Sequence, residues 1–177
     1  MYSIYRPDDK NKDKTPGLLR VIFLSAGLIA GFLLMRIFFT SYKVTGISME
    51  PSYKAGDFII LFRLFKTDIN TPVLVKSPVE KDRYYFLRIA AKGGDTVQMI
   101  NKQLYVNGNL YQPGSKITSD DIRIFPGTFT PRDNSEKIII PQKHVFLLGD
   151  NIDRSYDSRY FGPVAEKNIT GKVLLNF

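Results

Sequence analysis

The stretch YYFLRIAAKGGDTVQMINKQLYVNGNLY, residues 84–111, decides the fold class. It contains apolar runs of strand length at 84–91, 96–100 and 103–111, separated by turn-forming residues. Asn107-Gly108 interrupts the last run and favours the tight turn of a β-hairpin. The stretch therefore predicts consecutive strands, with a hairpin at Asn107-Gly108.

Apolar runs of the same kind lie on both sides of this stretch. Strands are expected at 57–62, 72–77, 137–141, 144–150 and 171–177, and prolines fall at the edges of the runs, where strands tolerate them. Residues 114–135, rich in Ser, Thr, Asp and Pro, predict an exposed loop insertion. No helix is expected in this part of the chain, and so the predicted fold class is all-β.

A long apolar segment precedes the strands. LLRVIFLSAGLIAGFLLMRIFF, residues 18–39, has no charge between Val21 and Met35 and reaches the roughly twenty residues that cross a bilayer. It is apolar on every side, unlike a helix that packs on a soluble core, and no clear small-residue cleavage site follows it. We interpret residues 18–40 as a single transmembrane anchor.

Charge predicts the orientation of this anchor. Basic residues before a span favour the cytoplasm, which makes residues 1–17 a cytoplasmic tail and places residues 41–177 on the extracytoplasmic side of the inner membrane. The net charge is +8, which fits a solvated basic surface or one lying against anionic lipid. Nucleic-acid binding is not expected, because no dense basic cluster is interleaved with stacking aromatics. The absence of cysteine excludes disulfides and cysteine catalysis.

Two polar segments carry the candidate chemistry. In TGISMEPS (45–52), Gly46 allows a tight backbone path before Ser48 and Pro51 stiffens the chain after it. Such a turn would aim the Ser48 hydroxyl and leave backbone amides free for an oxyanion. In GDNIDRSYDSRYFGPV (149–164), Asp157 and Arg159 stand two residues apart and could pair on one face of an extended segment. A calcium loop would need a later glutamate that is missing, and no metal or other cofactor is expected.

The anchor, GISMEPS (46–52), NTPVLVKSP (70–78), FLRIAAKGGDTV (86–97) and residues 149–164 together resemble the bacterial type I signal peptidases. These are membrane-anchored serine endopeptidases that remove leader peptides from exported preproteins. The resemblance implies coiled antiparallel sheets, and substrates with small side chains near the cut. It also implies the site: Ser48 as nucleophile, Gly46 and the Ser48 backbone as oxyanion hole, Ser155 orienting the general base, Asp157 with Arg159 as a supporting pair, and Asp150 as a further motif acid.

The same resemblance implies a lysine as general base, directly before the arginine of the FLRIAAKGGD segment. Counting back from Gly93-Gly94-Asp95 aligns Arg88 with that arginine and Leu87 with the lysine. Leucine cannot accept a proton. Arg88 stays charged and points to the opposite face of the strand.

Other residues could supply the base. Lys92 is a tentative candidate, although it lies roughly 16 Å further along a regular strand and on the opposite face, and Lys81 lies further still. Lys76, on a neighbouring predicted strand, is the second tentative candidate, and His144 is the remaining one. Two functions stay open: a signal peptidase with an unexpected base, which retention of Ser48 favours, or a non-catalytic relative that binds peptide segments as an assembly or chaperone factor.

Overall fold

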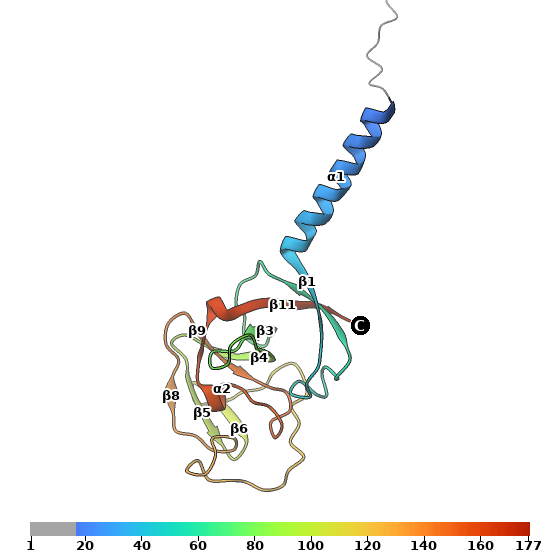
Figure 1. The fold of residues 1–177 in the computed structure, drawn as a ribbon. Helices are drawn as coiled ribbons and strands as arrows, with labels where there is room; N and C mark the ends of the chain where they lie inside the picture. The colour runs from blue at the N-terminus through green and yellow to red at the C-terminus, as the bar shows by residue number, and fades with distance from the viewer. Residues whose placement is uncertain (1–16) are drawn as a thin grey trace, which may run out of the picture. The chain divides into compact units, whose positions relative to one another are not determined.

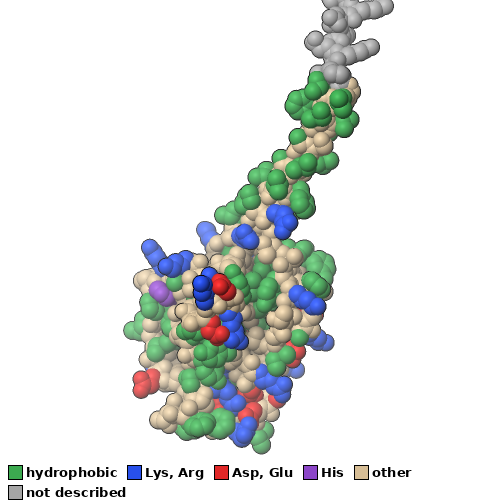
Figure 2. Space-filling model, viewed as in Figure 1, with side chains coloured by type: hydrophobic (Ala, Val, Ile, Leu, Met, Phe, Trp, Pro, Cys, Tyr) green, Lys and Arg blue, Asp and Glu red, His purple; other side chains and the backbone are tan. Residues whose placement is uncertain are grey.

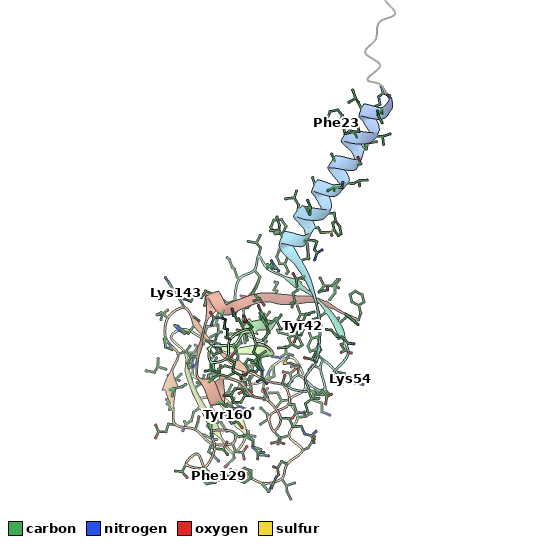
Figure 3. The ribbon with its side chains drawn as sticks, in the orientation of Figure 1. Phe23, Tyr42, Lys54, Phe129, Lys143 and Tyr160 are labelled. Atoms are coloured by element: carbon green, nitrogen blue, oxygen red, sulfur yellow. The ribbon has the colours of Figure 1, made fainter. Side chains whose placement is uncertain are left out.

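The computed structural model describes residues 17–177, so most of the expected cytoplasmic tail, 1–16, lies outside the described residues. The chain divides into two units, the first ending at Ile37 and the second covering residues 38–177. The first holds helix α1, Gly17–Phe38, up to its last residue; the helix is long and apolar enough to cross a membrane and buries none of its side chains. Figure 2 shows hydrophobic side chains along this helix. The helix ends at Phe38, and Phe39 and Thr40, expected in the span, begin a strand instead.

The second unit is built mainly from a seven-stranded sheet (Figure 1). Within residues 17–177, all the strand pairings of this sheet are antiparallel. In spatial order the strands are β1 Phe39–Lys43, β2 Phe58–Phe62, β11 Ile169–Asn176, β3 Pro72–Lys76, β4 Tyr84–Lys92, β9 His144–Leu148 and β10 Val164–Ala165. Register shifts in the pairings of β11 and β4 mark bulges, which bend and twist a sheet.

A smaller antiparallel sheet contains the hairpin that was predicted from Asn107-Gly108. Its order is β7 Asn109–Leu110, β6 Gln103–Val106, β5 Thr96–Ile100 and β8 Ile138–Ile139. Between β7 and β8, residues 114–135 form no strand or helix, apart from one bridge between Thr118 and Asn151. In Figure 1, β5, β6 and β8 lie on one side of this unit and β11 on the other. The all-β prediction for this part of the chain is confirmed.

The expectation that no helix follows the anchor is wrong at two short places. Helix α2, Ser158–Phe161, is four residues long, and the 3-10 helix η1 covers Glu166–Asn168. The Asp157 side chain caps α2 by accepting a hydrogen bond from the Arg159 amide. Helices this short have no apolar periodicity, and so a sequence pattern does not reveal them.

Strand β4 runs through the centre of the core and is buried on both faces from Tyr85 to Ala91. Leu87 and Ile89 pack with Val145 and Leu147 in one apolar cluster. Phe86, on the opposite face, joins a different cluster with Met49 and Leu74. Because neighbouring positions of a strand point to opposite faces, each residue of β4 is committed to one of these environments.

Candidate active site

Ser48 lies in the turn that connects β1 to β2. The turn is closed by a hydrogen bond from the Tyr53 amide to the Met49 carbonyl, and Met49 is completely buried beneath it. The half-buried hydroxyl of Ser48 donates to the Phe86 carbonyl on β4 at 3.1 Å. Within residues 17–177 the Ser48 amide makes no hydrogen bond. This N–H is therefore available as a donor, and the expected role in an oxyanion hole stays a prediction.

Gly149 lets two segments approach each other closely. A Cβ atom built on Gly149 would come within 2.2 Å of Ser155 Oγ and 2.6 Å of the Ser48 carbonyl oxygen, so no side chain fits there. The Ser48 carbonyl also accepts a hydrogen bond from the Asn151 amide at 2.9 Å. The structure thus brings Ser48 and Ser155, 107 positions apart in the chain, together around Gly149.

The Leu87 side chain lies on the face of β4 that is turned toward Gly149 and Ser155. Arg88 is opposite Leu148 in the β4–β9 pairing, and extending this antiparallel register by one residue places Leu87 opposite Gly149. Residues directly opposite in a sheet share a face, so the Leu87 side chain is directed toward the space that Ser155 Oγ occupies beside Gly149. Leu87 is 0% exposed. The residue that the resemblance aligns with a lysine therefore lies on the same face of the sheet as Ser155 Oγ.

Ser155 Oγ is buried and has no hydrogen-bond partner among residues 17–177. A buried hydroxyl without a partner costs about 1–3 kcal/mol. An apolar side chain at position 87 cannot satisfy it, whereas a lysine amine there could donate to it. Ser155 Oγ therefore lacks a partner that a polar side chain at position 87 would supply and that Leu87 does not.

Asp150 forms a buried ion pair on the other face of β4. The Arg88 guanidinium donates to both Asp150 carboxylate oxygens, at 2.8 and 2.6 Å, and to the Asn70 carbonyl at 2.7 Å. Burial by itself would lower the pKa of Arg88, but the Asp150 carboxylate outweighs it and the pKa is raised. Arg88 therefore stays charged and anchors β4 to the motif segment.

The predicted pairing of Asp157 with Arg159 is present, but in a helix cap rather than an extended segment. Arg159 Nε donates to Asp157 Oδ1 at 2.8 Å, and both side chains are fully buried. The second carboxylate oxygen accepts from the Gly149 amide at 3.0 Å, and Arg159 also donates to the Ile152 carbonyl at 2.8 Å. This network fixes Gly149 and the segment that carries Ser155.

The structure does not bring the tentative bases to Ser48. Lys92 Nζ donates to the Thr67 carbonyl at 3.2 Å, at the far end of β4. Lys76 Nζ lies 3.9 Å from Asp82 in the turn after β3, and His144 Nδ1 lies 2.9 Å from the Gln142 carbonyl. In the part of the chain that the structure describes, no hydrogen bond or ion pair joins these three side chains to Ser48 or Ser155.

Two tyrosines near the Arg88–Asp150 pair are also poor proton acceptors. Burial raises the pKa of Tyr53 and that of Tyr111 above the ordinary value of a phenol. Each phenol is therefore protonated at neutral pH and offers no phenolate base.

Comparison with known proteins assigns this arrangement to a family. The sequence profile described as "Signal peptidase, peptidase S26" matches residues 17–177. The chain belongs to the S26 family of signal peptidases, which are serine endopeptidases. It is 32% identical over 169 residues to Signal peptidase I V of Bacillus subtilis (strain 168), covering 84% of this chain and 93% of the relative.

Other signal peptidases show the same likeness. Signal peptidase IB of Staphylococcus aureus (strain Mu50 / ATCC 700699) is 30% identical over 174 residues, covering 89% of this chain and 87% of the relative. The crystal structure of a signal peptidase I from Enterococcus faecalis V583 matches with a TM-score of 0.47 and 26% identity, covering 63% of this chain and 99% of that one.

The chain has a serine at each of the two positions that the resemblance assigns to the nucleophile and to the base-orienting residue, and an Asp157–Arg159 ion pair where it assigns a supporting pair. It differs at position 87, where leucine stands in place of the amine. The arrangement can bind a peptide carbonyl at Ser48, but no described amine is positioned to take the serine proton.

Sequence reasoning missed a cluster of buried charges beside this site. Lys102 Nζ donates to Asp153 Oδ1 at 2.7 Å, and the other Asp153 oxygen accepts from the Ser119 hydroxyl and the Asp121 amide. Arg132 pairs with Asp133 at 2.6 Å, and its carbonyl accepts from Arg159. The loop 114–135 is thereby tied to the motif segment. Partners up to 51 residues apart leave no local pattern that would have revealed them.

Proposed function

We propose that this chain is a membrane-anchored endopeptidase that acts on the signal peptides of exported preproteins, with Ser48 as the nucleophile. The single observation that carries the proposal is the convergence of Ser48 and Ser155 around Gly149, because no side chain at position 149 would permit it. A helix long enough to cross a membrane immediately precedes the β-domain and supports the anchoring.

The proposed reaction is acyl transfer. Ser48 Oγ bonds to the scissile carbonyl carbon, the Ser48 amide stabilises the oxyanion, the C–N bond breaks, and water then hydrolyses the ester. The serine proton must finally reach the leaving amine. General-base assistance contributes about 10²–10⁴ in rate, and so a leucine at position 87 implies slow turnover.

An apolar cavity supports binding of an extended leader segment. It has a volume of about 360 Å³ and is lined mainly by Tyr42, Leu61, Leu74 and Tyr84. Leu61 and Leu74 also belong to the cluster that contains Met49, which follows Ser48 in the chain, and Phe86, whose carbonyl accepts from the Ser48 hydroxyl. Aliphatic side chains of the leader segment, which forms the acyl part of the ester, would fit such a cavity.

A second function is supported by Leu87 itself. A fully buried leucine beside an unsatisfied Ser155 hydroxyl is what a peptide-binding relative without catalysis would have. Such a protein would hold leader segments as an assembly or chaperone factor.

Full-length protein in detergent, given a labelled preprotein, separates these functions. We expect slow cleavage that Ser48→Ala abolishes, with preprotein binding unchanged in the variant. Binding without any cleavage, in the native protein and in Ser48→Ala alike, would favour the binding function. Cleavage that persists in Ser48→Ala would refute the assignment of the nucleophile.

The proposed topology has residues 1–17 in the cytoplasm and the β-domain outside the inner membrane. Protease added to intact spheroplasts should digest the β-domain while the membrane remains sealed. Full protection of that domain would show the opposite orientation.

A further inference from the structure

A polar cavity of about 610 Å³ lies away from Ser48, between the loop after β2, the end of β4 and η1. Basic side chains outnumber acidic ones in its lining. The basic residues are Arg63, Lys66, Lys92 and Lys167, and the acidic ones are Asp68 and Glu166. The cavity therefore has a positive field that favours an anion.

The lysines of this cavity are free to bind a ligand. Among residues 17–177, none of its three lysines forms an ion pair, and Lys92 makes one hydrogen bond, to the Thr67 carbonyl. An ammonium group has three N–H donors, so Lys92 keeps two and the others keep all of theirs. Several uncommitted cationic donors around one cavity match the chemistry of a phosphate group.

The position of the cavity indicates which kind of phosphate compound lies near it. The Arg63 amide donates to the carbonyl of Phe38, the last residue of α1, at 2.9 Å, and its guanidinium donates to Thr40 at 2.9 Å. Arg63 is therefore within hydrogen-bonding distance of the residue at which the apolar span ends. Its neighbour Leu64 is 62% exposed. A basic cavity with an exposed apolar residue beside the end of a span is suited to the headgroup region of a bilayer.

We propose that this cavity binds the phosphate of an anionic phospholipid headgroup and thereby holds the β-domain at the membrane surface. The inference rests on the membrane anchoring in the proposed function, but not on cleavage by Ser48. An acidic peptide could use the same charges, but the contact with Phe38 and the exposed Leu64 favour lipid.

Native mass spectrometry of the full-length protein in mixed micelles tests the inference. We expect phosphatidylglycerol to be retained at least about tenfold better than phosphatidylcholine, because each lysine near a lipid headgroup contributes appreciably to anion binding. Lys66→Glu/Lys167→Glu should lose this preference. The matched control Lys81→Glu/Lys137→Glu changes the net charge equally at exposed positions outside the cavity and should keep it. Ser48→Ala should retain lipid like the native protein, which separates this test from that of the peptidase.

Three results would overturn the proposal. The first is equal retention of both lipids by the native protein. The second is an equal loss of phosphatidylglycerol in the two double variants, which would show a general charge effect. The third is binding of inorganic phosphate or of an acidic peptide as tightly as phosphatidylglycerol, with the same sensitivity to Lys66 and Lys167, which would assign the cavity to a soluble ligand.

Discussion

Ser48 Oγ donates to the carbonyl of Phe86 at 3.1 Å, which fixes the candidate nucleophile to the strand residue that directly precedes Leu87. The hydrogen bond crosses 38 positions of sequence and joins the β1–β2 turn to β4. It places this candidate nucleophile one residue away from Leu87, the position that the resemblance to signal peptidases aligns with a lysine. The consequences concern both stability and activity.

Gly149→Ala should destabilise the β-domain. The added methyl group would overlap Ser155 Oγ at 2.2 Å and the Ser48 carbonyl oxygen at 2.6 Å, and overpacking of this kind typically costs about 1–3 kcal/mol. Gly114→Ala is the matched control, because a Cβ atom at Gly114 meets nothing within 4 Å. Thermal unfolding measures both variants. Equal melting temperatures for the two would contradict the close packing at Gly149.

Ser155→Gly should partly rescue Gly149→Ala, because it removes both Ser155 atoms that the new methyl group meets. A double-mutant cycle in thermal unfolding measures this coupling. Purely additive losses would mean that Ser155 is not what the added methyl group meets.

The Asp153 carboxylate should make stability depend on acid pH. Burial by itself would raise its pKa, but hydrogen bonds from Lys102, the Asp121 amide and Ser119 outweigh burial and lower it. A depressed folded-state pKa gives stabilisation that is complete above the unfolded value of about 3.9 and is lost as pH falls through the folded value. Asp153→Asn should therefore lower the melting temperature strongly at pH 7 and less at a pH below the unfolded value, such as pH 3.

Asp82→Asn is the control for this experiment, since the Asp82 side chain is 75% exposed. It should change the melting temperature little at either pH. An Asp153→Asn effect of the same size at pH 7 and pH 3 would show that ionisation of Asp153 does not stabilise the fold.

Much of the fold follows from the sequence. The strands at 84–92, 96–100 and 103–106 have clear apolar runs, and the hairpin at Asn107-Gly108 has a specific turn signal. Strand β1 was missed because Phe39 and Thr40 continue the apolar span in sequence, whereas their pairing with Phe62 and Leu61 depends on tertiary structure. Helix α2 was missed because its Asp157 cap supports only one turn.

The sequence predicted which residues belong to the candidate site, but not how their side chains are arranged in space. The motifs identified Ser48, Ser155, Asp157 and Arg159, and the spacing to Gly93 identified Leu87 as the substituted position. That Leu87 faces Gly149 depends on the register between β4 and β9, which no local pattern gives. The directions of the Lys92 and Lys76 side chains likewise depend on Thr67 and Asp82.

Removal of the tentative bases should leave any cleavage nearly unchanged. Lys92→Gln, Lys76→Gln and His144→Gln each alter a side chain whose polar atom contacts another part of the chain, and we expect rates within about twofold of the native rate. Initial rates with a labelled preprotein measure this. A loss of about 10²–10⁴ in any one variant would identify that residue as the base after all.

The most direct measurement compares preprotein cleavage by the native protein, Leu87→Lys and Leu87→Met in detergent at neutral pH. A lysine at position 87 would place its amine toward Ser155 Oγ, and burial would lower its pKa toward neutrality. Methionine adds a flexible chain of similar size without an amine. We expect Leu87→Lys to cleave about 10²–10⁴ faster than the native protein, with the gain abolished by Ser48→Ala, and Leu87→Met to show no gain. A correctly folded Leu87→Lys variant that binds preprotein but cleaves no faster than Leu87→Met would contradict the conclusion that position 87 limits catalysis at Ser48.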